Sequence, residues 1–219
     1  MRMPREYPIR TMLERIERAT AAFPKAAMFQ LRERGFTSLF QQLVSCAISI
    51  RTLDEVSLPL SLALFERAPD AASVLALPEQ DLIDLLHGSM YPGQKAATIR
   101  AIAEADLAGK LRPEFESLTA IKGIGPKCAN LALGVSSGHA AISVDIHVHR
   151  VTNRWGLVRT TTPEKTMTAL EAAVPRDLWT DINRVLMPFG KHLCTGTLPR
   201  CSDCPVYEWC ERVGVGKHR

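Results

Sequence analysis

Four of the six cysteines stand close together near the C-terminus, with the spacing C-x6-C-x2-C-x5-C: Cys194, Cys201, Cys204 and Cys210. This is the strongest constraint on the fold, because one short loop must bring four thiols to a common centre. In a reducing compartment, clustered thiols more often hold a metal or an iron–sulfur cluster than form disulfides. A zinc ribbon normally has two close pairs separated by a dozen or more residues. Zinc stays open as an alternative, but a single compact loop of soft ligands favours a [4Fe-4S] cluster.

The other two cysteines, Cys46 and Cys128, stand alone in apolar stretches. A free cysteine in such surroundings behaves as a small hydrophobic residue. We expect both as separate core thiols.

The rest of the chain has the composition of a folded protein, with 219 residues, 46% of them hydrophobic and 23% charged. These values exclude a disordered tail and a collagen-like chain, and the length suits one or two domains. Apolar residues recur at helical spacing, as in Met12–Ile16–Ala19, and Gly or Pro separates such segments. Residues 142–148 alternate apolar and polar, but continuation of the apolar face to Trp155 favours a helix that begins near Asp145. Thr162 followed by Pro163 predicts another helix start. The pattern predicts an all-α protein.

No segment has the properties of a membrane span. The apolar block Val56–Phe65 is short and contains Pro59, whereas a span needs about 20 apolar residues. The N-terminal residues 1–6 carry charges with no apolar core after them, so we expect no secretory signal. The chain is expected to be soluble and cytoplasmic.

Charge is unevenly distributed along the chain, although the net charge is only +4. Residues 120–160 contain basic side chains and a single acidic one, Asp145, beside a more acidic segment, 28–119. Such a block is typical of a polyanion-binding surface, and equally of a solvated basic face without a partner.

The segment 118–130 contains two glycines, Gly123 and Gly125, on either side of one apolar residue, followed by Lys127. A tight turn here would expose backbone amides at a helix start, where the helix dipole also attracts a phosphate. Taken alone, the pair also fits an ordinary helix–helix turn.

The cysteine spacing, the glycine turn with Lys127, and Asp145 further along together resemble the endonuclease III family of DNA glycosylases. The resemblance implies a two-domain helix-hairpin-helix fold with a cleft between the domains. A helical barrel would comprise residues 28–139. Residues 1–27 and 140–219 would form the second domain, with a [4Fe-4S] cluster on the four C-terminal cysteines.

The same resemblance implies the reaction, in which Lys127 is the nucleophile and Asp145 its partner carboxylate. A lysine attacks a sugar carbon only as the free amine, which partial desolvation or nearby positive charge promotes. A carboxylate takes up a proton or stabilises the cationic sugar as the base departs. The implied activity is that of a DNA glycosylase and abasic-site lyase of base excision repair, acting on oxidised pyrimidines.

The resemblance also implies contacts to DNA. Two residues align with side chains that fill the gap left by the extruded nucleotide, namely Ala47 and Tyr91. Ala47 falls at the glutamine of the family pattern Leu-Ser-x-Gln-x-Thr when that pattern is counted from Ser45. The remaining expected contacts are Lys122, Gly123, Gly125, His147, Lys191 and Arg200. The implied partner is damaged double-stranded DNA, with single-stranded DNA as a further substrate, bound by a monomer associated with the nucleoid and not with a membrane.

Because alanine cannot fill a gap in the base stack, Ala47 predicts weakened DNA opening and a preference for abasic or single-stranded sites. An alternative is an iron–sulfur protein that binds DNA damage with little base release. A zinc-ribbon nucleic-acid adaptor is a third.

Overall fold

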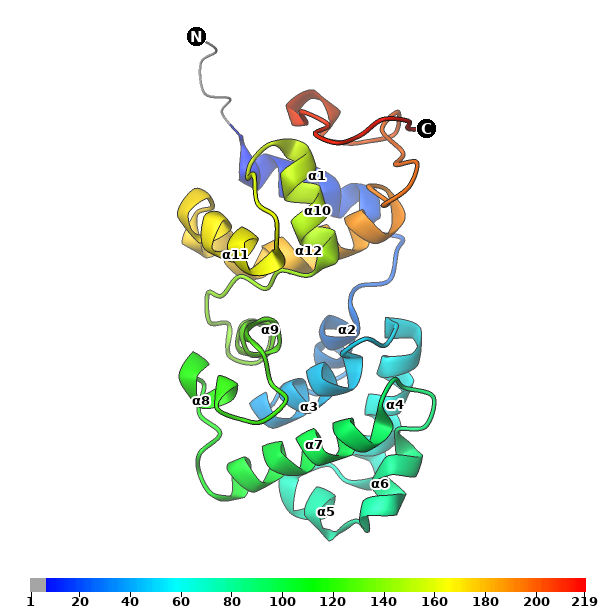
Figure 1. The fold of residues 1–219 in the computed structure, drawn as a ribbon, viewed down its shortest axis with the longest axis vertical. Helices are drawn as coiled ribbons and strands as arrows, with labels where there is room; N and C mark the ends of the chain where they lie inside the picture. Colours follow the sequence, from blue (N-terminus) through cyan, green and yellow to red (C-terminus); the bar gives the residue numbers. More distant parts are fainter. Residues whose placement is uncertain (1–6) are drawn as a thin grey trace. The chain divides into compact units, whose positions relative to one another are not determined.

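The computed structural model describes residues 7–219, which form helices, turns and loops without a β-strand (Figure 1). The expected all-α class is therefore confirmed. Residues 1–6, on which the prediction of no secretory signal rests, lie outside the described residues. Among residues 7–219, no helix is both long enough and apolar enough to cross a membrane.

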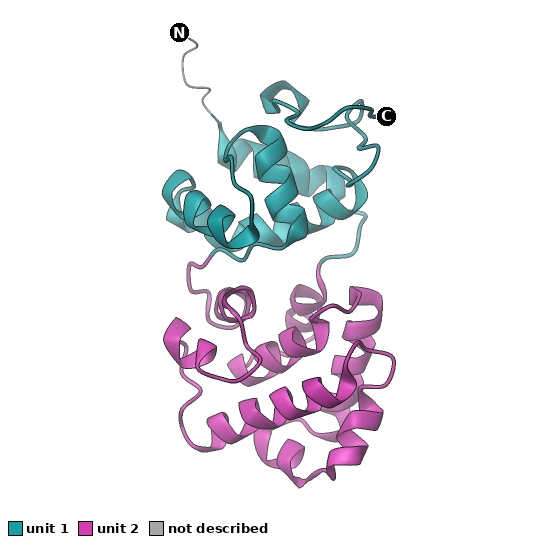
Figure 2. Ribbon diagram, viewed as in Figure 1, with its two compact units in different colours: residues 1–25, 142–219 teal, residues 26–141 magenta. Residues whose placement is uncertain are grey.

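The chain divides into two compact units, drawn in two colours in Figure 2. Unit 1 comprises Met1–Lys25 and Ile142–Arg219, and unit 2 comprises Ala26–Ala141. The expected domain ends, residues 27 and 139, lie two positions from the observed ends at 25 and 141.

Unit 2 contains the helices α2 (Ala27–Glu33), α3 (Leu39–Ser49), α4 (Asp54–Arg67), α5 (Ala71–Ala76), α6 (Glu79–Leu85), α7 (Pro92–Leu107), α8 (Phe115–Thr119) and α9 (Pro126–Ser137). Helix α3 packs against α4, α7 and α9, and α5 packs against α7. The burial of α3 follows from an apolar face that includes Leu43, Val44 and Ile48, none of which is exposed. Ser38 starts α3 by accepting a hydrogen bond from the Gln41 amide at 3.1 Å, a standard N-cap.

Unit 1 contains α1 (Ile9–Thr20), α10 (Ile146–Trp155), α11 (Pro163–Ala173) and α12 (Trp179–His192), with two short 3-10 turns, Arg176–Leu178 and Tyr207–Trp209. Helix α12 packs against α1 and α10. Both predicted helix starts are confirmed, since Asp145 caps α10 and Thr162 caps α11. The core of this unit includes Met12, Ile16, Val148, Trp155, Leu186 and Phe189.

The prediction that Cys46 and Cys128 are separate thiols is wrong. The two residues form a disulfide between α3 and α9, with their Cα atoms 5.8 Å apart. Both are buried, as expected. The pairing joins positions 82 residues apart, and helical periodicity carries no information about which faces meet over such a separation.

Candidate active site and cysteine loop

The turn between α8 and α9 requires a glycine at position 123. Gly123 has φ +94°, a left-handed conformation that other residues rarely adopt. A Cβ atom there would also lie 2.3 Å from Thr98 Oγ1 of α7. On either side of it, Ile121 and Ile124 are buried and anchor the turn to unit 2. The predicted hairpin is therefore built by one glycine and two apolar anchors.

Helix α9 starts directly after this turn. Its N-cap is Gly125, which has no side chain to accept from the first amides, and Pro126 occupies the first helical position. Lys127 follows and is exposed, and Lys122 is exposed on the turn before it. An exposed helix start with two lysines attracts an anion such as a DNA phosphate.

The expected role of Ala47 is wrong, because this residue lies inside α3 and is only 1% exposed. The helix continues to Ser49, so the exposed loop begins four residues later than expected. Counting the family pattern from Ser49 instead of Ser45 puts Arg51 at the glutamine position. Arg51 is exposed and has φ +52°. The expectation of weakened DNA opening loses its basis with Ala47.

A second exposed loop precedes α7 and contains Tyr91, which is 49% exposed with φ +57°. Its neighbour Met90 is 50% exposed. On the loop after α3, Ile50 and Leu53 are 42% and 68% exposed. The loop after α3 and the loop before α7 thus both present large side chains to solvent. Tyr91 is exposed, as its predicted contact with DNA requires.

Lys95 of α7 is the most deeply placed lysine near these loops, at 6% exposure. Its Nζ atom donates to the Ile48 carbonyl oxygen at 2.5 Å and to Thr52 Oγ1 at 2.6 Å. Burial lowers the pKa of Lys95 to about 8, while both acceptors favour its charged form.

In unit 1, Asp145 is held by the start of its own helix. Oδ1 accepts from the amides of His147 and Val148, each at 2.8 Å. Asn183 Nδ2 of α12 donates to Oδ2 at 3.4 Å. Asp145 is half-buried, and Ile146 beside it is 66% exposed. The carboxylate is thus fixed in direction, because two short hydrogen bonds hold Oδ1 while a longer one reaches Oδ2.

His147, an expected DNA contact, is half-buried against α12. A Cβ at Gly190 would lie 2.7 Å from His147 Cβ, so the glycine allows this close approach. Burial lowers the pKa of His147, against the opposing effect of the Asp145 charge. Arg150 Nη2 lies 3.1 Å from His147 Nδ1 and donates a hydrogen bond to the Gly190 carbonyl oxygen at 2.7 Å. Arg150 Nε donates to the Cys194 carbonyl oxygen at 3.2 Å. These contacts connect the start of α10 to the cysteine loop.

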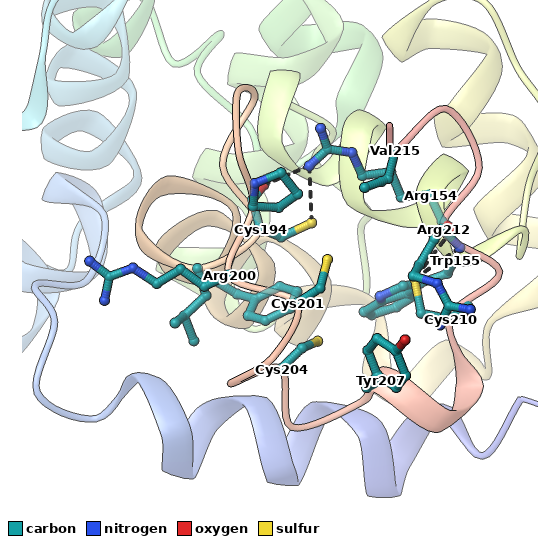
Figure 3. Close-up of a pocket in the computed structure, with 13 residues that line it drawn as sticks. Arg154, Trp155, Cys194, Arg200, Cys201, Cys204, Tyr207, Cys210, Arg212 and Val215 are labelled. Atoms are coloured by element: carbon teal, nitrogen blue, oxygen red, sulfur yellow. Dashed lines mark hydrogen bonds between the residues drawn. The ribbon is translucent and has the colours of Figure 1, made fainter. Parts of the chain in front are cut away.

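The four C-terminal cysteines surround one hollow in unit 1, as Figure 3 shows. Its empty volume is about 380 Å³, part of it open to solvent. Residues from the end of α10, from α12 and from the loop itself complete the lining: Arg154, Trp155, Phe189, Leu193, Pro199, Arg200, Tyr207, Arg212 and Val215. The sequence therefore predicted the shared location of the thiols.

Sequence reasoning missed Arg154, which organises the start of this loop. The residue is only 9% exposed. Its guanidinium donates to the carbonyl oxygens of Thr195 at 2.6 Å and Gly196 at 2.8 Å, and to Cys194 Sγ at 3.4 Å. A buried arginine needs such partners, but only the folded loop provides them.

Four thiols around one hollow are the donor type that a soft metal centre uses. Burial raises the pKa of Cys204 to about 12 and also raises the pKa values of Cys201 and Cys210, so thiolates at these three half-buried positions need a compensating positive charge. Metal coordination supplies that charge and deprotonates a thiol outright. As the side chains lie, residues 7–219 contain no group of three or more His, Cys, Asp or Glu that could hold a metal ion.

The sequence matches the family described as HhH-GPD superfamily base excision DNA repair protein, over residues 44–176. The chain belongs to this superfamily. It is 36% identical to endonuclease III of Thermotoga maritima over 194 residues, which cover 86% of this chain and 91% of the relative. It is 29% identical to endonuclease III of Bacillus subtilis, covering 78% of this chain and 80% of the relative.

Solved structures of endonuclease III show the same superfamily fold. A non-covalent endonuclease III–DNA complex superposes with a TM-score of 0.80 at 22% identity, covering 93% of this chain and 94% of that one. A trapped endonuclease III–DNA covalent intermediate gives 0.79 at the same identity and coverage. The predictions of the endonuclease III family, of its fold, and of a DNA glycosylase and lyase of base excision repair are confirmed.

Two groups of the predicted site residues lie together in the structure. The four cysteines share one hollow, and Lys122, Gly123, Gly125 and Lys127 share one helix start. Arg200 is exposed at the edge of the hollow, and Figure 3 shows its guanidinium pointing away from the sulfurs. Lys191 is half-buried in the last turn of α12. Ala47 is excluded because it is buried, whereas Arg51 is exposed.

Proposed function

We propose that Lys127 is the nucleophile with which this enzyme releases a damaged base and cuts the abasic site. The observation that carries the proposal is the position of Lys127, which is exposed in the first turn of α9, directly after the glycine hairpin. A helix start with amides and lysines draws the DNA backbone toward the same place as the amine.

In the proposed reaction, the Lys127 amine forms a bond to the sugar C1′ as the bond between C1′ and the base breaks. The sugar ring opens to an iminium ion. Loss of a proton from C2′ then breaks the bond between C3′ and its phosphate oxygen, and this β-elimination cuts the strand. Water finally hydrolyses the imine and restores the amine.

Asp145 is the proposed carboxylate partner. Its Oδ1 already serves two backbone amides, so Oδ2 is the oxygen that takes up a proton or stabilises the sugar cation. Fixing the carboxylate before substrate arrives avoids reorganisation during the reaction. The exposed Ile146 beside it makes this part of the site less polar.

DNA contacts follow from the exposed loops of unit 2. Reaching C1′ requires the damaged nucleotide to leave the stack, at a cost of a few kcal/mol. Arg51 and Tyr91 are the proposed side chains that fill the resulting gap, by hydrogen bonding and by stacking. Lys122, the hairpin amides, Lys191 and Arg200 are proposed backbone contacts, which carry no sequence information.

We propose that the four cysteines hold a [4Fe-4S] cluster. Cysteine thiolates are the ligands that such a cluster would use, and all four of these cysteines line one hollow of unit 1. A [4Fe-4S] cluster supplies electron-transfer chemistry when bound, and its proposed role in this protein is to fix the loop that carries Arg200. Iron and sulfide analysis with visible absorption tests this. Zinc in place of iron would overturn it.

Borohydride trapping on a duplex with one abasic site tests the lysine assignment. Wild type is expected to form a covalent adduct, and Lys127→Ala to form none. Lys165→Ala is the matched control and is expected to keep the adduct, because it removes an exposed lysine from the first turn of another helix, α11, to which no role is assigned. Tight binding by wild type without any adduct would instead favour the damage-binding alternative.

The proposed substrate is damaged duplex DNA with an oxidised pyrimidine. The proposed enzyme is a monomer that acts at the nucleoid in the cytoplasm. A panel of defined lesions in duplex and single-stranded DNA measures this preference directly. Faster excision of purine lesions than of pyrimidine lesions would contradict it.

A further inference from the structure

One hydroxyl group in unit 2, that of Thr52, connects three separate segments. Thr52 Oγ1 donates to the Ile50 carbonyl oxygen at 3.3 Å within the loop after α3. It accepts from Lys95 Nζ of α7 at 2.6 Å, and from the Met90 amide of the loop before α7 at 3.3 Å. A threonine hydroxyl has one donor and two acceptor positions, so all of its hydrogen-bonding capacity is used.

Lys95 extends the connection to the end of α3. Its Nζ atom also donates to the Ile48 carbonyl oxygen in the last turn of that helix. A positive charge at a helix C-terminus is favourable, because it interacts with the helix dipole. With Lys95 6% exposed, this contact is sheltered from water, so the loop is tied to a buried and charged anchor.

The residues beside these ties have a strained backbone. Arg51 precedes Thr52 and has φ +52°, and Tyr91 follows Met90 and has φ +57°. The left-handed conformation costs an ordinary residue about 1–2 kcal/mol, and it persists only where the surroundings enforce it. The Thr52 hydroxyl is bonded directly next to both strained positions.

We propose that Thr52 and Lys95 are positioning residues that hold the Arg51 and Tyr91 loops in one fixed arrangement, so that both side chains enter the duplex together. This inference rests on the proposed function, in which those two side chains fill the gap in the base stack. It assigns the pre-organisation of the loops to a half-buried threonine and a buried lysine, neither of which contacts DNA in the proposal.

The variant Thr52→Val tests the proposal, since it removes the hydroxyl while keeping the branched shape. Single-turnover release of an oxidised pyrimidine from duplex DNA is expected to slow by about tenfold to a hundredfold, the range for a misplaced contact. Strand cleavage at an abasic site in single-stranded DNA is expected to stay within about twofold of wild type, because no base stack must be opened there. Thr52→Ser, which keeps the hydroxyl, is expected to restore the duplex rate.

Two further variants separate positioning from general damage. Lys95→Met keeps an unbranched apolar stem and removes the ammonium group, and should repeat the duplex-specific loss. Ser49→Ala removes a nearby hydroxyl whose hydrogen bond, to the Cys46 carbonyl oxygen, stays within α3, and should leave both rates unchanged. Equal loss on duplex and single-stranded substrates in Thr52→Val, or no loss on either, would overturn the proposal.

A readout without chemistry keeps this test distinct from that of the lysine mechanism. With a fluorescent base analogue opposite an abasic site, wild type should raise the fluorescence by unstacking the analogue, and Thr52→Val should raise it much less. If wild type gives no borohydride adduct but shows this difference, the lysine mechanism fails and the positioning pair stands. An equal rise in both proteins refutes the pair alone.

Discussion

The two proposed reacting groups both lie at helix starts, but the two helices begin in opposite ways. Helix α9 has a glycine N-cap and an exposed lysine in its first turn. Helix α10 begins with Asp145, whose carboxylate occupies the His147 and Val148 amides. An uncapped start can accept an external anion, whereas a start capped by its own carboxylate repels one. The start of α9 therefore suits an anion, whereas the start of α10 carries a fixed negative charge.

The two helices are also anchored differently. Helix α9 is held through Cys128, the residue that follows Lys127. Cys128 is buried and forms a disulfide with Cys46 of α3. Helix α10 has no covalent anchor among its described contacts; it is held by buried apolar residues such as Val148 and Trp155 and by polar contacts, including His149 Nδ1 with Thr166 Oγ1 of α11 at 2.6 Å. The disulfide and the buried residues thus hold α9 from behind, while Lys127 at its start is exposed.

The largest expected effect concerns the covalent anchor of α9. Cys46→Ala with Cys128→Ala should lower the free energy of unfolding by about 2–4 kcal/mol, because the bond closes a long loop in the unfolded chain. Denaturant unfolding of wild type and the double variant, with and without reductant, measures this. An unchanged midpoint in wild type on adding reductant would mean that the disulfide does not anchor α9.

A smaller effect is expected in the turn before α9. Gly123→Ala should cost about 1–3 kcal/mol, because a left-handed alanine is strained and its Cβ would meet Thr98. Gly125→Ala is the matched control, with no atom within 4 Å of the added Cβ, and should cost less than about 1 kcal/mol. Equal losses of stability would show that the turn does not depend on the shape of Gly123.

Two substitutions of Asp145 separate its role as the N-cap of α10 from its proposed role in the reaction. Asp145→Ala should lower stability by about 1 kcal/mol, whereas Asp145→Asn keeps an N-cap and should change it little. Both should slow base release by at least about a hundredfold, since neither has a carboxylate. Chemical unfolding and single-turnover excision distinguish the two roles. Full activity in Asp145→Asn would remove Asp145 from the mechanism.

The smallest effect concerns pH and His147 in the first turn of α10. Burial holds the pKa of His147 below 6.5 in the folded chain, so the unfolded chain binds more protons just below that pH. Stability should therefore fall as the pH drops below 6.5. His147→Gln should make this fall less steep in unfolding experiments between pH 5 and pH 7, and an identical slope would contradict the assignment.

Sequence motifs predict the structure correctly where a feature depends only on residues that are neighbours in the chain. Asp145 and Thr162 cap helices as predicted, because an N-cap needs only its own side chain and the next few amides. The hairpin glycines and the spacing of the cysteine loop are recognisable for the same reason. These short-range features are enough to indicate the all-α class and the family.

Contacts between distant segments are not recognisable in this way. The family pattern fits both Ser45 and Ser49, and only the packing of α3 against its neighbours shows that the helix continues to Ser49. The spacing alone therefore does not decide between Ala47 and Arg51. The buried arginine Arg154 escapes sequence reasoning because its partners are main-chain oxygens of a loop some 40 residues away.

The sequence by itself determined the helices, the hairpin, the metal-type cysteine loop and the family, since each rests on short-range spacing. Only the tertiary structure decided that Cys46 bonds Cys128, that Ala47 is buried, and that Thr52 ties two loops to Lys95. The physical reason is that a side chain's partner across the core depends on which helix faces meet. Helix periodicity specifies which face is apolar but not what that face will pack against.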